Sequence, residues 1–267
     1  MTLQLTRDNY YSKEADIAYL SHSQYNNFLQ CEAMAMALIN REWIEPANDN
    51  LLVGSYVHAW NEGTLEEFKA KTPEMFKKDG TPYAKFLFAD QMVATLQNDP
   101  FCMFVLDGQK EVIMTAEMFG APWKIRIDSY NPEKRRIVDL KTTRSINDLV
   151  WSDERWAKVS FVDAYNYPRQ MAIYCEVERL VKGQAKWGEP LIVAVSKEGP
   201  PDKAIISLVD DARFEMELRH IEENLPRILA IKQGLEPPQR CGKCPYCRST
   251  KKIDGVIHYS TLGLPDA

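Results

Sequence analysis

Two acidic residues and a lysine stand at a spacing that suits metal-assisted chemistry on a phosphate. Asp128 is followed after ten intervening residues by Asp139, and Lys141 stands two residues further on. Two carboxylates held close together repel each other, and a divalent cation relieves that repulsion. Magnesium prefers carboxylate oxygens and keeps positions open for water and phosphate. A lysine beside such an ion can hold the attacking water or steady the charge on the phosphate.

These three residues are expected on adjacent strands of a β-meander, because apolar and polar residues alternate there between turn signals. The expected strands are residues 111–119, 123–130 and 136–141, with turns at 120–122 and 131–134. If Asn131 pairs with Lys134, Asp128 lies diagonally from Asp139 on one face, about 7–8 Å away. Taken on spacing alone, a lattice of ion pairs on a solvated strand face explains the same residues equally well.

Helical patterns flank this meander on both sides. Helices are expected at residues 21–40 and 52–62, from residue 64, ahead of Asp99, and at 168–181 and 212–233. Two more strands are expected at residues 191–195 and 204–209. Helices first, a sheet in the middle and helices again predict an α/β fold with a central mixed β-sheet flanked by helices.

The bulk composition is that of an ordinary globular protein. The chain has 267 residues, 45% of them hydrophobic, and a net charge of −5. That charge argues against a protein that coats nucleic acid over its whole surface, but it allows a local basic groove. The N-terminus lacks the apolar core of a signal peptide, and no segment approaches the roughly 20 apolar residues of a membrane span. We therefore expect a cytoplasmic protein without a membrane partner.

Three of the six cysteines form a C-x-x-C-x-x-C run at residues 241–247. In a reducing compartment, cysteines are metal ligands or buried thiols more often than disulfides. Three thiols this close indicate a metal centre, which needs a fourth ligand. Cys31 is the candidate, with His220 and His258 as alternatives.

The hairpin motif resembles that of a known superfamily. Arg126-Ile127-Asp128, followed by the string from Val138 through Asp139-Leu140-Lys141 to Thr143, is similar to the PD-(D/E)xK nucleases, in particular their RecB-type branch, which includes phage-type exonucleases. The resemblance implies one nuclease domain over residues 1–267 with a restriction-endonuclease-like core. It also implies that Asp128, Asp139 and the carbonyl of Leu140 bind Mg²⁺ or Mn²⁺, and that Lys141 is catalytic.

Two flanking motifs extend the resemblance. Gly54, His58 and Glu62 stand four residues apart, hence on one face of a helix. They resemble a Gly-x-x-x-His helix of the same branch, whose histidine joins the metal, with Glu62 as a supporting residue. Gln170 and Tyr174 resemble its Gln-x-x-x-Tyr motif, which lies beside the active site and implies substrate contacts.

Other residues extend the expected site. Glu111 matches an acidic residue that some relatives carry one strand earlier, with Glu117 as the alternative. Basic residues that could contact DNA phosphates form two groups. They are Lys141, Arg144, Arg155, Lys158 and Arg169, and then Arg240, Lys243, Arg248, Lys251 and Lys252. Aromatic residues within the first group could stack on bases of a frayed end. They are Trp151, Trp156, Tyr165 and Tyr167.

The cysteines also follow a pattern of this branch. AddB-like and CRISPR adaptation nucleases place one cysteine before the nuclease core and three after it, and these hold a [4Fe–4S] cluster. By this resemblance, Cys31, Cys241, Cys244 and Cys247 hold an iron–sulfur cluster, and residues 235–252 form a metal-binding tail against the N-terminal helix. The spacing between Cys244 and Cys247 is shorter than usual in those relatives, which keeps zinc as the alternative.

Taken together, the motifs predict a metal-dependent deoxyribonuclease, an exonuclease of phage or recombination type. The resemblance implies that such enzymes often work with a single-strand annealing protein, and that some form rings. The alternative is a non-catalytic DNA-binding or metal-stapled scaffold protein that retains the nuclease fold.

Overall fold

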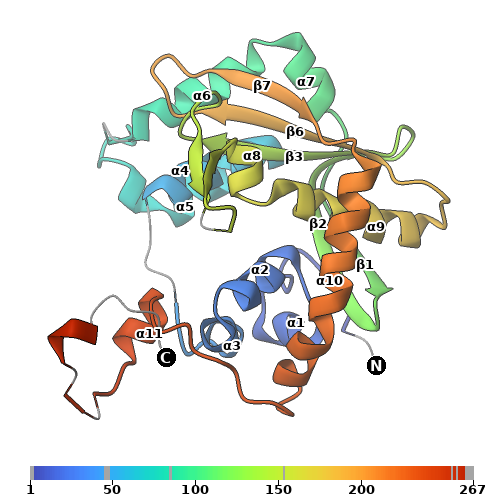
Figure 1. The fold of residues 1–267 in the computed structure, drawn as a ribbon. Helices are drawn as coiled ribbons and strands as arrows, with labels where there is room; N and C mark the ends of the chain where they lie inside the picture. The colour runs from blue at the N-terminus through green and yellow to red at the C-terminus, as the bar shows by residue number, and fades with distance from the viewer. Residues whose placement is uncertain are drawn as a thin grey trace.

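A mixed five-stranded sheet forms the centre of the molecule (Figure 1). The computed structural model describes residues 3–44, 49–83, 86–152, 154–253, 255–256 and 258–261. The strands lie in the order β1 (Gln109–Met118), β2 (Ala121–Asn131), β3 (Arg136–Thr143), β6 (Glu189–Ser196) and β7 (Lys203–Ser207). β3 and β6 are parallel, and the other neighbours are antiparallel. The mixed sheet predicted from the sequence is confirmed.

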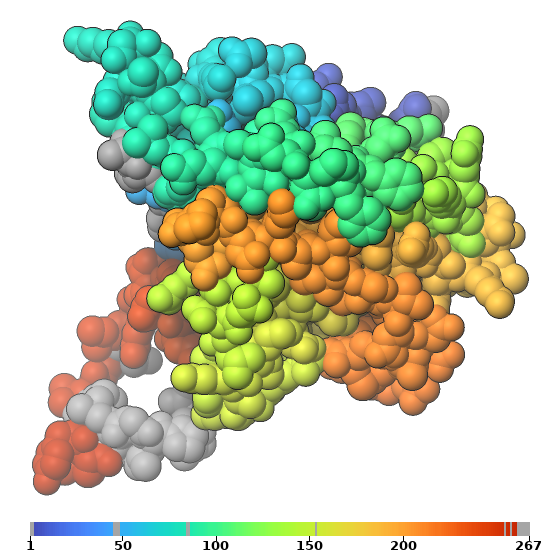
Figure 2. Space-filling model, turned by 90° about the horizontal axis from the view of Figure 1, so that it is seen from above, coloured from blue at the N-terminus to red at the C-terminus, as the bar shows by residue number. Residues whose placement is uncertain are grey.

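Each face of the sheet is covered by helices, because its buried strands are apolar on both faces. On β6, Leu191 and Val193 pack with α4 (Asp49–Glu62), α6 (Leu87–Gln97) and α7 (Pro100–Leu106). Ile192 and Ala194 pack on the other face with α9 (Tyr167–Lys182), α10 (Asp211–Lys232), α2 (His22–Gln30) and α3 (Glu32–Asn40). Seen from above, α6 and α7 form a continuous layer beside β7 (Figure 2). None of the described helices is long and apolar enough to cross a membrane.

Short elements complete the chain. They are α1 (Lys13–Ala18), α5 (Leu65–Lys71), η1 (Pro73–Met75), β4 (Val150–Ser152), β5 (Ala157–Val159), α8 (Phe161–Ala164), α11 (Pro245–Ser249) and η3 (Tyr259–Thr261). β4 and β5 form a separate two-stranded hairpin. The sequence analysis did not anticipate α1, α7, α8 or this hairpin. For α7 the signal was present, because Asp99 caps the backbone N–H groups of Phe101 and Cys102, and Pro100 occupies the first turn.

One expected helix is wrong. The single helix expected over residues 21–40 is divided into α2 and α3 at Cys31, which has an extended backbone conformation. Ser21 does cap α2, by accepting a hydrogen bond from the N–H of Gln24. The break turns the Cys31 side chain toward the C-terminal cysteines, so it has a structural purpose that helical periodicity cannot show.

The expected pairing of the central hairpin is also wrong. Asn131 pairs with Arg136, not with Lys134, because the turn spans residues 132–135 and Arg135 adopts a left-handed backbone conformation with φ 51°. Continuing the observed register by one residue places Asp128 directly opposite Asp139. A shift of two residues keeps every side chain on its expected face, so the two aspartates still share one face.

β2 changes partners along its length. It pairs with β3 only from Ser129–Val138 to Asn131–Arg136. Near the start of β2, Leu20 pairs with the same edge of the strand. Its N–H donates to the Pro122 carbonyl and its carbonyl accepts from the Lys124 N–H, both at 2.8 Å. Between these two pairings the edge of β2 is open toward β3, next to Asp128.

A buried carboxylate fixes α9 to the central hairpin. Glu178 of α9 is fully buried and accepts hydrogen bonds from Tyr130 Oη at 2.7 Å and from Arg135 Nε at 3.0 Å. Tyr130 lies on β2 and Arg135 in the turn that leads to β3. This network therefore fixes the position of α9 along β2 and β3, the two strands that carry the aspartates.

Replacing Glu178 by alanine removes both acceptors and leaves the Tyr130 hydroxyl without its partner in the core. We expect the free energy of unfolding, measured by urea denaturation, to fall by about 3 kcal/mol. The matched control is Glu222→Ala, an exposed position on α10, which should change it by less than about 0.5 kcal/mol. Equal stabilities of the two variants would contradict the role given to Glu178.

Candidate active site

The Asp128 side chain, rather than a backbone carbonyl of β2, accepts a hydrogen bond from the backbone of β3. Its Oδ2 accepts a hydrogen bond from the Leu140 N–H on β3 at 2.7 Å. Its Oδ1 lies 3.4 Å from His58 Nδ1 on α4. The carboxylate is therefore buried and held in one orientation by two different elements.

Asp139 is fixed from α9 and from its own strand. Gln170 Nε2 donates to Asp139 Oδ1 at 2.8 Å, and Lys141 Nζ lies 2.6 Å from Asp139 Oδ2. Oδ2 is buried, and the Lys141 ammonium is its partner. Lys141 Nζ also lies over the ring of Tyr167, 4.7 Å from its centroid.

Gly54 allows α4 to pack closely against β3. A Cβ atom at Gly54 would lie 3.3 Å from Thr142 Oγ1 on β3, tighter than usual van der Waals contact. His58 and Glu62 follow at one-turn intervals, and Asn61 Nδ2 donates to the backbone carbonyl of Asp128 at 3.3 Å. The predicted Gly-x-x-x-His helix therefore lies beside the hairpin.

The protonation tendencies of the two aspartates differ. Burial opposes the charge of Asp128, but the neighbouring His58 and the Leu140 N–H hold its pKa below the ordinary value. Burial raises the pKa of Asp139, and the charge of Asp128 adds to the effect against the opposing Lys141. Burial also opposes the charge of Lys141, yet Asp139 holds the pKa of Lys141 above its usual range. A cation between the carboxylates would favour the ionised form of both.

Glu111 and Arg126 form an ion pair next to the aspartates. The pairing of β1 with β2 passes from Lys110–Ser129 to Val112–Ile127, and Glu111 between them has φ 56°. Its side chain is fully buried, 2.7 Å from Arg126 Nε, and burial raises the pKa of Glu111 to about 8. The alternative acidic residue, Glu117, is exposed and lies at the far end of β1.

A cavity of about 1210 Å³ joins these side chains. Among the expected site residues, it is lined by His58, Glu62, Asp128, Asp139, Lys141, Gln170 and Tyr174. The sequence analysis missed the other charged and aromatic groups of its wall, most of which come from the N-terminal third of the chain. They include Arg7, Tyr10, Tyr11, Arg41, Lys124 and Arg126.

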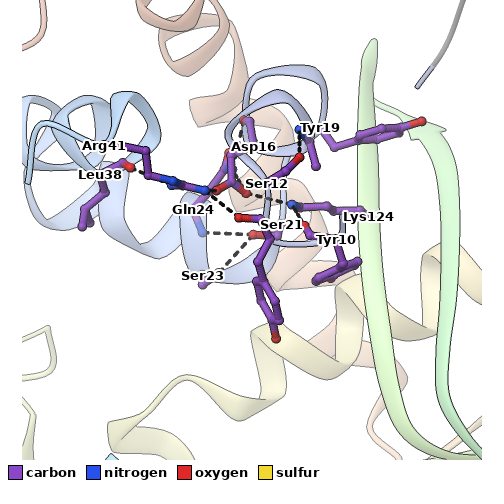
Figure 3. A network of polar contacts seen from close by, with 12 residues as sticks. Tyr10, Ser12, Asp16, Tyr19, Ser21, Ser23, Gln24, Leu38, Arg41 and Lys124 are labelled. Carbon is purple, nitrogen blue, oxygen red and sulfur yellow. Dashed lines mark hydrogen bonds and ion pairs between the residues drawn. The ribbon is translucent and has the colours of Figure 1, made fainter. Parts of the chain in front are cut away.

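One wall of the cavity is a polar network centred on Asp16 of α1 (Figure 3). Its carboxylate accepts from Arg41 Nη2 at 2.7 Å, Lys124 Nζ at 2.8 Å and Gln24 Nε2 at 3.0 Å. Lys124 Nζ also donates to the Tyr10 carbonyl at 2.6 Å. Because these residues come from α1, α2, the residue after α3 and β2, the network fastens the N-terminal segment to β2.

The basic residues proposed to contact DNA have different surroundings. Arg169 is buried and donates to Glu217 at 2.8 Å and Glu154 at 2.9 Å. Its assignment as a phosphate contact is therefore wrong. Arg144 and Lys158 are exposed and lie outside the cavity lining.

The four cysteines of the second expected site come together. The sulfur atoms of Cys31, Cys241, Cys244 and Cys247 all lie within 4.8 Å of one another. The N–H groups of Cys244 and Cys247 each donate to the sulfur three residues earlier at 3.3 Å. Burial opposes ionisation, but backbone N–H groups lower the pKa of Cys241 to about 6. The set has the composition of a four-thiolate zinc or iron–sulfur site.

The histidine alternatives are not ligands of this group. His220 Nδ1 lies 3.2 Å from the Tyr25 hydroxyl, and His258 Nδ1 lies 2.8 Å from Ser260 Oγ. Cys31 supplies the fourth sulfur, 3.6 Å from Cys247 Sγ. The C-terminal segment is thus attached to the break between α2 and α3.

The chain is similar to known proteins in sequence and in fold. A family model described as "PDDEXK-like domain of unknown function (DUF3799)" matches residues 21–250. The chain is similar to the crystal structure of a "Putative exonuclease" from Eubacterium rectale, with 38% sequence identity and a TM-score of 0.91 over 98% of this chain and 99% of that chain. A second structure, of SSO0001, aligns at 15% identity with a TM-score of 0.31 over 84% of this chain and 91% of that chain, too low to support an argument. No curated protein matches the chain.

Removing one sulfur should empty the cysteine site. Wild type purified without oxygen is expected to carry about one zinc or about four irons per chain, and Cys31→Ser is expected to lose most of that metal. Elemental analysis measures the content, and limited proteolysis should then cut residues 235–250 faster. Cys102→Ala is the control, since Cys102 is buried in another core cluster. Undiminished metal in Cys31→Ser would refute this ligand set.

Proposed function

The chain belongs to the family of PDDEXK-like domains that this model describes, and from that premise we propose that it is a metal-dependent deoxyribonuclease. The proposal in full is an exodeoxyribonuclease of phage or recombination type, acting in the cytoplasm. One observation carries it. Asp128 on β2 and Asp139 on β3 line the same cavity, and Lys141 contacts the second of them at 2.6 Å.

The residues present fit a divalent cation. His58, Asp128 and Asp139 line one cavity, and two carboxylates with an imidazole form a donor set that Mg²⁺ or Mn²⁺ accepts. We propose that Asp128, Asp139, His58 and the carbonyl of Leu140 hold the ion. When bound, it would supply a Lewis acid for the phosphate and lower the pKa of a bound water.

The side chains around the aspartates have separate tasks in this proposal. Lys141, held between Asp139 and the Tyr167 ring, would donate a hydrogen bond to the attacking water or to a phosphate oxygen. Gln170 keeps Asp139 in place through its 2.8 Å hydrogen bond. Asp139 holds the pKa of Lys141 above its usual range, so in this proposal the lysine serves as a donor and electrostatic partner.

Substrate contacts are proposed along the cavity. Gln170 and Tyr174 line it beside Asp139, and Glu62 lines it from α4. Glu62 also lies 3.4 Å from Arg7, which suits a supporting role at the substrate side. Arg144 is exposed just after β3 and would contact phosphates further from the cut.

Arg126 is the cavity cation best placed to meet a phosphate. It is two residues from Asp128 on the same strand face and lines the cavity. Its guanidinium is held from behind by Glu111 and lies over the rings of Tyr10 and Tyr11, 5.6 Å and 4.7 Å from their centroids. An arginine ordered in this way loses little freedom when it binds a phosphate.

The remaining assignments rest on the resemblance. We propose that the cysteines hold a structural [4Fe–4S] cluster, with zinc as the alternative. A single-strand annealing protein as partner, and assembly into an oligomer, are proposed on the same basis.

The experiment that tests the function is release of nucleotides from linear and closed-circular duplex DNA. With Mg²⁺ or Mn²⁺, wild type should degrade the linear form only. Lys141→Ala should lower the rate by roughly a thousandfold, because the reaction loses its fixed cationic donor. Lys186→Ala, at an exposed position, is the control. Absence of cleavage of any duplex or single strand with either metal would favour the alternative, a non-catalytic DNA-binding protein that retains the fold.

Arg126→Ala should weaken binding of duplex DNA by about tenfold. It should also reduce the slope of log affinity against log salt concentration by the contribution of about one phosphate contact. Fluorescence anisotropy at several salt concentrations measures both. Arg126→Lys should keep the salt dependence, and Arg219→Ala, exposed on α10, should change neither quantity. A double variant with Glu111→Gln removes the buried charge that Arg126→Ala would leave behind. Wild-type affinity in that double variant would rule out the phosphate contact.

A further inference from the structure

The two faces of the β4–β5 hairpin differ: one packs against the core, and the other carries exposed side chains. Val150 pairs with Val159 and Ser152 with Ala157, and this face lies toward the molecule, where Val150 packs against the core. Trp151 pairs with Lys158, so these two share the opposite face. Trp151 is 53% exposed, and Lys158 is exposed beside it. The outward face of the hairpin thus pairs a large aromatic ring with a cation.

The turn of the hairpin presents a second tryptophan. Trp156 is 82% exposed and adopts a left-handed backbone conformation, with φ 50°. A bulky residue rarely adopts this conformation, which costs free energy. An indole exposed to water at such a cost, with an exposed lysine two residues further on, is not explained by packing. In the view from above, the yellow-green segment containing β4 and β5 projects at the edge of the molecule (Figure 2).

Polar contacts anchor this turn to the start of α9. Glu154 accepts from Arg169 Nη2 at 2.9 Å and from Asn166 Nδ2 at 3.0 Å. Arg155 lies 3.0 Å from Asp163 of α8. Arg169 directly precedes Gln170, the residue that binds Asp139. The hairpin is therefore fixed to the same helix turn that orients a carboxylate of the active site.

Aromatic rings connect the surface to the catalytic lysine. Tyr165, at the end of α8, is 52% exposed. Its ring lies 5.9 Å from that of Tyr167, and Lys141 Nζ lies over the Tyr167 ring. The row Tyr165, Tyr167, Lys141 thus leads from the surface next to the hairpin into the proposed site.

We propose that the β4–β5 hairpin, with Tyr165, is a binding surface for the unpaired bases of single-stranded DNA. Aromatic rings interleaved with cations bind single strands because every base has a face that stacks. The surface would hold the single-stranded end that leads to Lys141, so the substrate of the proposed nuclease would be a strand that is unpaired at the cut. This assignment of substrate rests on the proposed function, but the binding surface does not require cleavage.

The test compares two probes that have the same phosphates. One is a fluorescein-labelled oligothymidylate, and the other is an abasic oligonucleotide of the same length. Affinities are measured by anisotropy without added divalent cation, so that cleavage does not enter the result. Wild type should bind the strand with bases about tenfold more tightly than the abasic strand.

Trp156→Ala combined with Tyr165→Ala should bring the two affinities together, whereas Trp156→Phe should keep the preference because it retains a ring. Phe101→Ala is the matched control, since Phe101 is 61% exposed on α7 in the layer that covers the other face of the sheet. Circular dichroism checks the fold of each variant. Equal binding of both probes by wild type, no binding of either, or an unchanged preference in the double variant would overturn the proposal. A base preference that depends on Trp156 would support it even if no metal produced cleavage, a result that would reject only the nuclease.

Discussion

Two carboxylates from neighbouring strands have to be held together in a buried place, against their mutual repulsion. The hydrogen bond from the Leu140 N–H to Asp128 does this at the point where the ladder between β2 and β3 ends. The side chain of one strand takes the backbone donor of the other, so the sheet can open without leaving that donor unsatisfied. α4 and the N-terminal segment supply His58, Tyr10 and other residues of the cavity wall, together with Gln170 and Tyr174 of α9.

Local patterns in the sequence were enough to predict the sheet, and the resemblance to the nucleases then selected the residues of the candidate site. The three meander strands were visible from alternation, and the spacing of Asp128, Asp139 and Lys141 indicated a shared face. The helix expected at residues 168–181 is α9, which ends at Gly183 in a left-handed conformation. These features depend on residues near each other in the chain, which is why sequence reasoning found them.

Features that depend on distant residues were not predictable in the same way. Several polar residues of 131–136 can form a turn, and the pairing depends on Arg135 adopting a positive φ while binding Glu178, 43 residues away. Arg169 looked like a surface cation, but it pairs with Glu217, 48 residues further on. Cys31 interrupts a helix without a glycine or proline, because its partner sulfurs stand at the other end of the chain. The short β4–β5 hairpin has too few residues for a periodic signal.

The position of Cys31 also affects the order in which the protein can be completed. Cys31 and Cys247 are 216 residues apart, and their sulfur atoms lie 3.6 Å from each other. During synthesis, Cys31 emerges early, and the ligand set is incomplete until residue 247 has left the ribosome. A metal held by all four sulfurs would therefore close the chain into one large loop as a last step of assembly, at an entropic cost that grows only slowly with the length of that loop. Metal bound by all four cysteines would therefore indicate that both ends of the domain have been synthesised and have come together.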